Sequence, residues 1–157
     1  MLTGASAGGV AVALWNNYLK DYVREEKKVY PIADSGAFSI FKTHKGDAKI
    51  EKQLQNIYKL ANSGEPTPMD VCDDMFLKEE YKCYFLQNTY RYIFGRFMII
   101  NSEYDSWAIE NILDEKCLKN GTSGMTLSGC NRTQMSYIEK YRDLYMQLET
   151  KFFVRND

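Results

Sequence analysis

The most constraining feature of this sequence is the pentapeptide Gly4–Gly8, which matches the pattern G-x-S-x-G. A serine in this pattern sits on a sharp turn between a strand and a helix, and the turn has room only for small neighbours. The residues flanking Ser6 are all glycine or alanine, and residues 10–22 then carry an apolar stripe at helical spacing. The segment therefore predicts a strand, a sharp turn and a helix. The alternative is an ordinary glycine-rich turn or helix cap.

The strand–turn–helix interpretation implies a specific chemistry for Ser6. On such a turn the hydroxyl projects toward a substrate and can act as a nucleophile. The backbone N–H of Ala7, at the start of the helix, can then donate to the oxyanion of a tetrahedral intermediate. The N-terminus of the helix also favours negative charge there.

Strand and helix signals alternate along the rest of the chain. A short apolar run over residues 29–33 predicts a strand, although Pro31 weakens it, and the continuous apolar run over residues 97–100 is typical of a buried parallel strand. Helices are expected at 48–61, 87–93 and 107–113, with a final helix capped by Asn131 or Thr133, whereas 118–129 is expected to be a loop. No repeat or linker divides the chain. The predicted fold is a single α/β domain over residues 1–157, part of a mostly parallel sheet with helices on both faces.

Asp105 is the candidate acid of the site. It lies in a polar loop after the strand at 97–100, about 100 residues beyond Ser6, and α/β-hydrolases order their triad as serine, then acid, then histidine. An ordinary loop aspartate is the alternative. The single histidine, His44, precedes Asp105 and lies among lysines, so we expect it to have a surface role.

Composition limits the possible partners and compartment. The net charge of −1 gives no electrostatic case for nucleic acid, and no run of 18 apolar residues predicts a membrane span. The four cysteines form no CxxC pair, which argues against a metal site but leaves three disulfide pairings open. An even cysteine count and sequons at Asn120 and Asn131 favour the secretory route. No signal peptide is recognised at Met1, which disagrees with a secretory route, and one explanation is that the true N-terminus is not present.

Several blocks resemble the pectinacetylesterase/Notum family in the family's own order, from residue 3 to about residue 148. The blocks are Gly4–Gly9, Ala33–Gly36 with Phe38, Cys83–Asn88, and Phe97–Ile100 with Asn101–Trp107. The resemblance implies Ser6 as nucleophile, Asp105 as triad acid, Ala7 as an oxyanion donor, and Asp34 and Ser35 beside the pocket. It also implies the disulfides Cys72–Cys83 and Cys117–Cys130. No cofactor is expected, and an acetylated extracellular polysaccharide is the first choice of substrate, with a lipid-modified protein the second.

Compared with that family, the sequence has no histidine after Asp105 and only half a strand before Ser6. One explanation is an internal fragment or truncated gene model of a longer enzyme. The other is a short protein that lost its triad and serves as a structural or binding subunit, in which case a partner chain must cover the exposed sheet. We favour the first, because the blocks around Ser6 and Asp105 are both retained.

Overall fold

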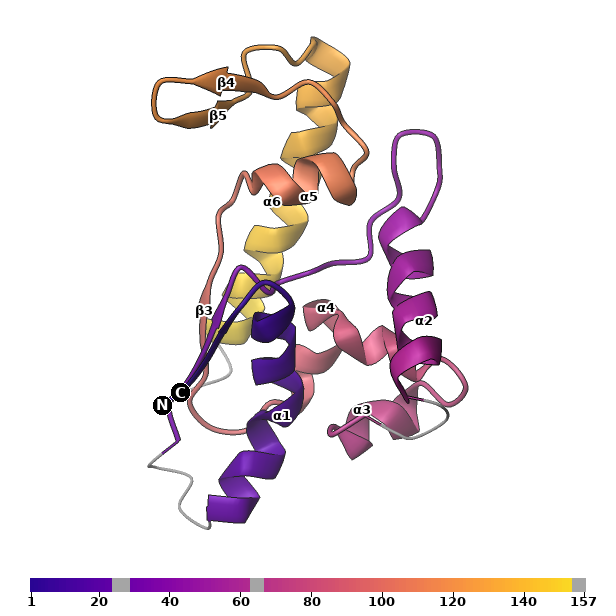
Figure 1. Cartoon of the computed structure of the whole chain (residues 1–157), viewed down its shortest axis with the longest axis vertical. Coiled ribbons are helices and arrows are strands. Elements are labelled where there is room, and N and C mark those ends of the chain that lie inside the picture. Colours follow the sequence, from indigo (N-terminus) through magenta and orange to yellow (C-terminus); the bar gives the residue numbers. More distant parts are fainter. Residues whose placement is uncertain (24–28, 63–66, 154–157) are drawn as a thin grey trace.

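A computed structural model describes residues 1–23, 29–62 and 67–153, and its centre is a parallel sheet (Figure 1). Strands β1 (Leu2–Ala5), β2 (Pro31–Asp34) and β3 (Met98–Ile100) lie in the order β1-β2-β3. The register aligns Ala5 with Asp34 and Asp34 with Ile100, so the three strands end at one edge of the sheet. The predicted α/β class is confirmed, with a parallel sheet flanked by helices.

The helices follow the predicted apolar spacing closely. The long ones are α1 (Ala7–Val23), α2 (Lys49–Asn62) and α6 (Arg132–Phe153). Asn131 caps α6 as predicted, because its side-chain oxygen accepts from Gln134 N at 3.0 Å. Shorter helical segments are α3 (Asp70–Met75), η2 (Glu80–Tyr84), α4 (Leu86–Thr89), η3 (Tyr90–Tyr92) and α5 (Ser106–Asn111).

The expectation of a loop over residues 118–129 was wrong in part. The segment contains an antiparallel hairpin of β4 (Lys119–Gly121) and β5 (Gly124–Thr126). All six strand residues are exposed, so the hairpin has no buried face to produce an alternating apolar pattern. The disulfide Cys117–Cys130 closes the base of the hairpin, and a second disulfide joins the buried Cys72 and Cys83. These are the pairs that the resemblance implies.

The two faces of the parallel sheet have different surroundings. Ala33 is buried in a core cluster with Val12 and Ala13 of α1, and Ile99 of β3 packs against the same cluster. Neighbouring strand residues alternate between faces. The opposite face carries Met98 and Ile100, which are 53% and 46% exposed. Within the described residues, α1 thus covers one face of the parallel sheet, and large apolar side chains on the other face are exposed.

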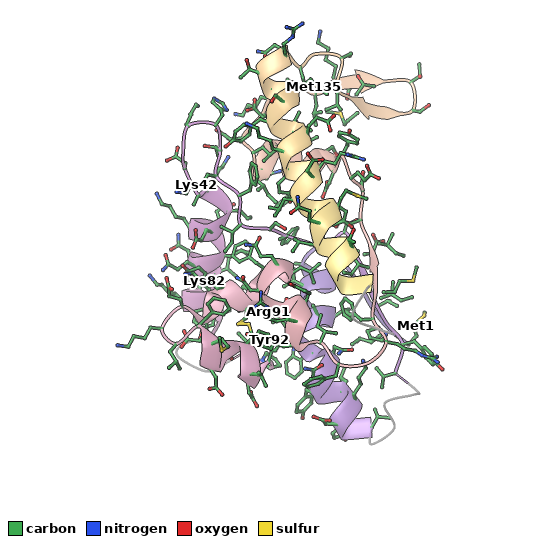
Figure 2. The ribbon with its side chains drawn as sticks, turned by 180° about the vertical axis from the view of Figure 1, so that it is seen from behind. Met1, Lys42, Lys82, Arg91, Tyr92 and Met135 are labelled. Carbon is green, nitrogen blue, oxygen red and sulfur yellow. A yellow bond between two sulfur atoms is a disulfide. The ribbon has the colours of Figure 1, made fainter. Side chains whose placement is uncertain are left out.

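A second core cluster lies beyond the carboxyl ends of the strands and links segments far apart in the sequence. Ile109, Ile112 and Leu113, in and just after α5, pack there with Ile138 of α6. Figure 2, viewed from behind, shows α6 running along this side, with Met135 at its upper end. The loop after β2 joins the cluster through Phe38, so one core fixes the loops that follow β2 and β3.

Candidate active site

Ser6 joins β1 to α1 in a left-handed backbone conformation, with a φ of 55°. Its N–H donates to Asp34 O at 2.9 Å, which continues the β1–β2 ladder by one residue. Its carbonyl accepts from Gly9 N at 2.9 Å and begins the helical hydrogen bonds. A positive φ is unfavourable for serine and persists only where the surroundings hold it. This is the predicted sharp turn between strand and helix, and the Ser6 residue is exposed on it.

The glycines around Ser6 allow close backbone contacts. A Cβ on Gly4 would lie 2.3 Å from Gly8 O, so no larger residue fits at this position without moving the start of α1. A Cβ on Gly36 would lie 2.6 Å from the carbonyl carbon of Gly9. Gly8 differs, because a Cβ there would meet nothing within 4 Å. The turn therefore depends sterically on Gly4 but not on a missing side chain at Gly8.

Asp34 is the last residue of β2 and Ser35 follows it, at the same edge of the sheet as Ser6. Ser35 also has a positive φ, of 50°, and its N–H donates to Ile100 O at 2.6 Å. Its hydroxyl donates to Asp34 Oδ1 at 2.8 Å. Ser35 thus repeats the backbone geometry of Ser6 one strand along, but no helix starts directly after it.

Asp105 lies five residues beyond β3 and is the N-cap of α5. Its Oδ1 accepts from Trp107 N at 2.9 Å, which fixes the carboxylate at the start of the helix. Burial, together with the charge of Asp105, raises the pKa of Tyr141 above its ordinary value. The Trp107 ring stacks on Phe38 at 5.1 Å between ring centres, which connects the Asp105 loop to the loop that begins at Ser35 after β2.

His44 is held by a different carboxylate. Its Nδ1 lies 2.7 Å from Glu115 Oε1, and Gln134 Nε2 donates to Glu115 Oε2 at 2.8 Å. The His44 side chain is 42% exposed, whereas that of Glu115 is only 3% exposed. His44 is at the surface as expected, but sequence reasoning missed its buried partner. The two residues are 71 positions apart and no local pattern connects them.

Two further contact sets position the site without touching Ser6. Asn17 Nδ2 on α1 donates to Tyr92 O at 2.6 Å, and Lys20 Nζ donates to Arg96 O at 3.0 Å, so α1 holds the segment that leads into β3. Gln87 Oε1 accepts from Ile40 N at 2.8 Å and supports the loop after β2. Asn17 and Lys20 lie three residues apart on one helix, which places both side chains near each other. Neither residue type by itself predicts that the side chain will donate to backbone carbonyls of a distant segment.

The described residues contain no group of three or more His, Cys, Asp or Glu side chains that could hold a metal ion. Within the same residues, no helix is long and apolar enough to cross a membrane. A surface hollow of about 440 Å³ lies along α6, lined by Asp143, Met146, Gln147 and Thr150. None of the predicted site residues contributes to that lining.

Comparison with known proteins decides the family. The sequence model described as pectinacetylesterase matches residues 1–156. The chain belongs to the pectinacetylesterase family. Pectin acetylesterase 11 of Arabidopsis thaliana is 25% identical over 147 residues, which cover 91% of this chain and 37% of the relative. Pectin acetylesterase 7 of the same organism is 25% identical over 151 residues, covering 94% of this chain and 38% of the relative.

A solved structure shows the same fold. The Wnt deacylase Notum from Drosophila, in crystal form I, superposes with a TM-score of 0.73 at 20% sequence identity. The match covers 96% of this pectinacetylesterase-family chain and 42% of the Notum chain. The chain thus spans about two fifths of the length of the proteins that it matches. Its fold and family are established by these matches, and the predicted resemblance is confirmed.

Proposed function

We propose that this chain supplies the nucleophile and the acid of a serine carboxylic-ester hydrolase of the pectinacetylesterase type. The observation that carries the proposal is the strained Ser6, which lies between a parallel strand and the 17-residue helix α1. Strained backbone that the surroundings enforce is common at sites of chemistry. Family membership independently supports the reaction class.

The reaction would proceed through an acyl-enzyme. The Ser6 hydroxyl attacks the ester carbonyl carbon, while a histidine base takes the hydroxyl proton. The Ala7 N–H, in the first turn of α1, donates to the oxyanion of the tetrahedral intermediate. The ester C–O bond then breaks, and the histidine returns the proton to the leaving alcohol. Water, activated by the same base, attacks the acyl group and releases the acid and free Ser6.

The histidine base would come from outside this chain. His44 is the single histidine, and its Nδ1 faces the buried Glu115 rather than Asp105. Among the described residues, only the Trp107 N–H donates to the Asp105 carboxylate, so its second oxygen remains available to orient an incoming imidazole. We therefore expect no ester turnover by this chain alone.

The proposed substrate is an acetylated extracellular polysaccharide or glycoconjugate, in line with the pectin acetylesterases among its relatives. An acylated protein is the second choice, by comparison with a protein described as a Wnt deacylase. The two disulfides favour an oxidising, secretory compartment. Asn120 and Asn131 are both exposed and are the proposed glycosylation sites. The oxygen of Asn131 caps α6, which leaves its side-chain nitrogen for a glycan.

A non-catalytic subunit is a second candidate function, and a specific observation favours it. The only imidazole in the chain is engaged by Glu115, so the chain offers Ser6 no unengaged histidine as a base. Such a subunit would need a partner chain over the exposed sheet residues Met98 and Ile100.

The two candidates are separated by hydrolysis of p-nitrophenyl acetate and by acetate release from acetylated pectin. Both are measured with the full-length protein that carries this chain and with the chain alone. For the enzyme, Ser6→Ala lowers kcat by about 10³-fold or more. Ser35→Ala is the comparison variant, since Ser35 shares the left-handed backbone of Ser6 but no helix starts directly after it, and it should lower kcat far less than Ser6→Ala does. Full activity in Ser6→Ala, or loss only in Ser35→Ala, would refute the nucleophile assignment.

A further inference from the structure

The turn that leads from β3 to Asp105 is exposed, yet two of its side chains bind α6. Glu103 and Tyr104 form this turn, and both residues are exposed. Glu103 Oε2 accepts from Arg142 Nε at 2.6 Å, and the Tyr104 hydroxyl donates to Glu139 Oε1 at 2.9 Å. The Arg142 guanidinium also lies over the Tyr104 ring, 5.8 Å from its centre. These three contacts, among Glu103, Tyr104, Glu139 and Arg142, are termed the α6 brace.

Helix α6 is a firm support for this brace because its other face is buried. Ile138 and Tyr141 of α6 are buried in the core cluster that also contains Ile109 of α5. Figure 1 shows α5 and α6 next to each other. The two α6 residues of the brace are three positions apart, so their side chains lie on one face of the helix. The ring of Tyr104 belongs to neither core cluster, so polar contacts rather than burial hold the turn.

Asp105 follows the braced turn directly and lies close to the same part of α6. Its Oδ1 accepts from Trp107 N at 2.9 Å, which fixes the carboxylate on the side of α5. Burial and then the nearby charge of Asp105 raise the pKa of Tyr141, which precedes the braced arginine on α6. Residues 103–105 thus lie against residues 139–142. The carboxylate is held from α5 by its N-cap bond, and the turn before it is held from α6 by the brace.

We propose that the α6 brace positions the Asp105 carboxylate and that Arg142, which makes two of its three contacts, is a positioning residue of the ester hydrolase. The inference rests on the proposed function, in which Asp105 orients the histidine base. Misplacing a catalytic group by about 1 Å costs about 10²-fold in rate. Exposed ion pairs, in contrast, contribute little to global stability. Loss of the brace should therefore lower turnover while the protein stays nearly as stable.

The first test is kinetic and uses the full-length protein that carries this chain. Arg142→Met removes the ion pair and the ring contact together, so kcat on p-nitrophenyl acetate should fall about three- to tenfold. KM should stay within about twofold and the Tm within about 2 °C. Adding Glu103→Gln to Arg142→Met should cost little more, because both changes remove the same contact. Lys140→Met is the matched control, since Lys140 is an exposed cation of α6 that contacts Tyr137 instead, and its kcat should be unchanged.

The pH profile of kcat/KM distinguishes positioning of the acid from a merely structural role. A carboxylate beside an imidazole raises the pKa of the imidazole, and this pKa sets the acidic limb of the profile. If the brace orients Asp105, Arg142→Met should move the acidic limb to lower pH. A change that only loosens the fold would lower the active fraction at every pH and leave the limb in place.

Hydrogen exchange measured by mass spectrometry supplies a readout that needs no catalysis. The Trp107 amide, which donates to Asp105, should exchange at least about threefold faster in Arg142→Met and at the original rate in Lys140→Met. Unchanged kcat, acidic limb and exchange in Arg142→Met would overturn the brace alone. An equal loss of kcat in Lys140→Met, or a loss of kcat that follows a fall in Tm, would overturn it too. Faster exchange in a full-length protein that hydrolyses no ester would overturn the proposed function, and the role of Arg142 with it.

Discussion

Replacing Gly4 with alanine should destabilise the protein much more than replacing Gly8, although both belong to the same G-x-S-x-G pattern. A Cβ on Gly4 would lie 2.3 Å from Gly8 O and 2.5 Å from Gly8 C. Ordinary contacts begin at 3.4 Å, so the two segments must separate by about 1.1 Å. Both colliding atoms belong to the backbone, and no side-chain rotation can relieve the clash. Overpacking of this kind costs about 1–3 kcal/mol, and we expect at least about 2 kcal/mol here because the start of α1 must move.

The Gly8→Ala variant is the control for this prediction. A Cβ on Gly8 meets nothing within 4 Å, and alanine favours a helix over glycine by about 0.5–1 kcal/mol. Gly8→Ala should therefore be neutral or slightly stabilising. Urea unfolding followed by circular dichroism gives both free energies of unfolding. For a chain of this size, Gly4→Ala should lower the Tm by about 4–8 °C. Equal stability changes in the two variants would refute the steric account of the turn.

Three further predictions concern parts of the chain away from the turn. Burial, followed by the charge of Glu51, raises the pKa of Tyr81 to about 12. The folded protein thus favours the neutral phenol, and its free energy of unfolding should fall as the pH rises from about 10 to 12. In urea titrations, Tyr81→Phe should reduce this dependence of stability on pH. Glu115→Ala should cost about 1–3 kcal/mol of stability by removing a buried hydrogen-bonded carboxylate. A double-mutant cycle with His44→Ala should give a coupling energy above about 0.5 kcal/mol. Strict additivity of the two stability changes would contradict the pairing. Asn120 lies on the exposed hairpin and is a proposed glycosylation site. After expression through a eukaryotic secretory pathway, the protein should lose mass on treatment with peptide N-glycosidase, and an equal loss in Asn120→Gln would assign the glycan elsewhere.

The elements nearest Ser6 could be predicted from sequence because their signals are local. Small residues on both sides of Ser6 indicate a sharp turn, and apolar spacing over residues 10–22 indicates the helix that the structure shows as Ala7–Val23. The short apolar run ending at Ile100 similarly predicted the strand β3. The expectation that this strand is buried was wrong, because Met98 and Ile100 are exposed. These elements contain their own pattern, so tertiary contacts only adjust their ends by a few residues.

The remaining features depend on contacts that no local pattern encodes. All six strand residues of the β4–β5 hairpin are exposed, and the disulfide Cys117–Cys130 joins the two ends of the segment that contains it. The pairing of His44 with Glu115 joins residues 71 positions apart. Trp15, Tyr18 and Tyr22 of α1 recur at helical spacing in the sequence, but only the structure shows that these side chains are exposed. Sequence periodicity finds apolar faces and does not say which of them a given chain buries.

The central claim, that Ser6 is the nucleophile, is tested most directly by covalent labelling of the full-length protein that carries this chain. A fluorophosphonate probe reacts with an activated serine, and peptide mass spectrometry then locates the adduct. The account predicts one adduct, on Ser6, which persists in Ser35→Ala and disappears in Ser6→Ala. It also predicts loss of at least about 90% of labelling in Asp105→Asn, because the acid holds the imidazole in its working tautomer. An adduct on Ser35 or another residue, or undiminished labelling in Ser6→Ala, would contradict the account.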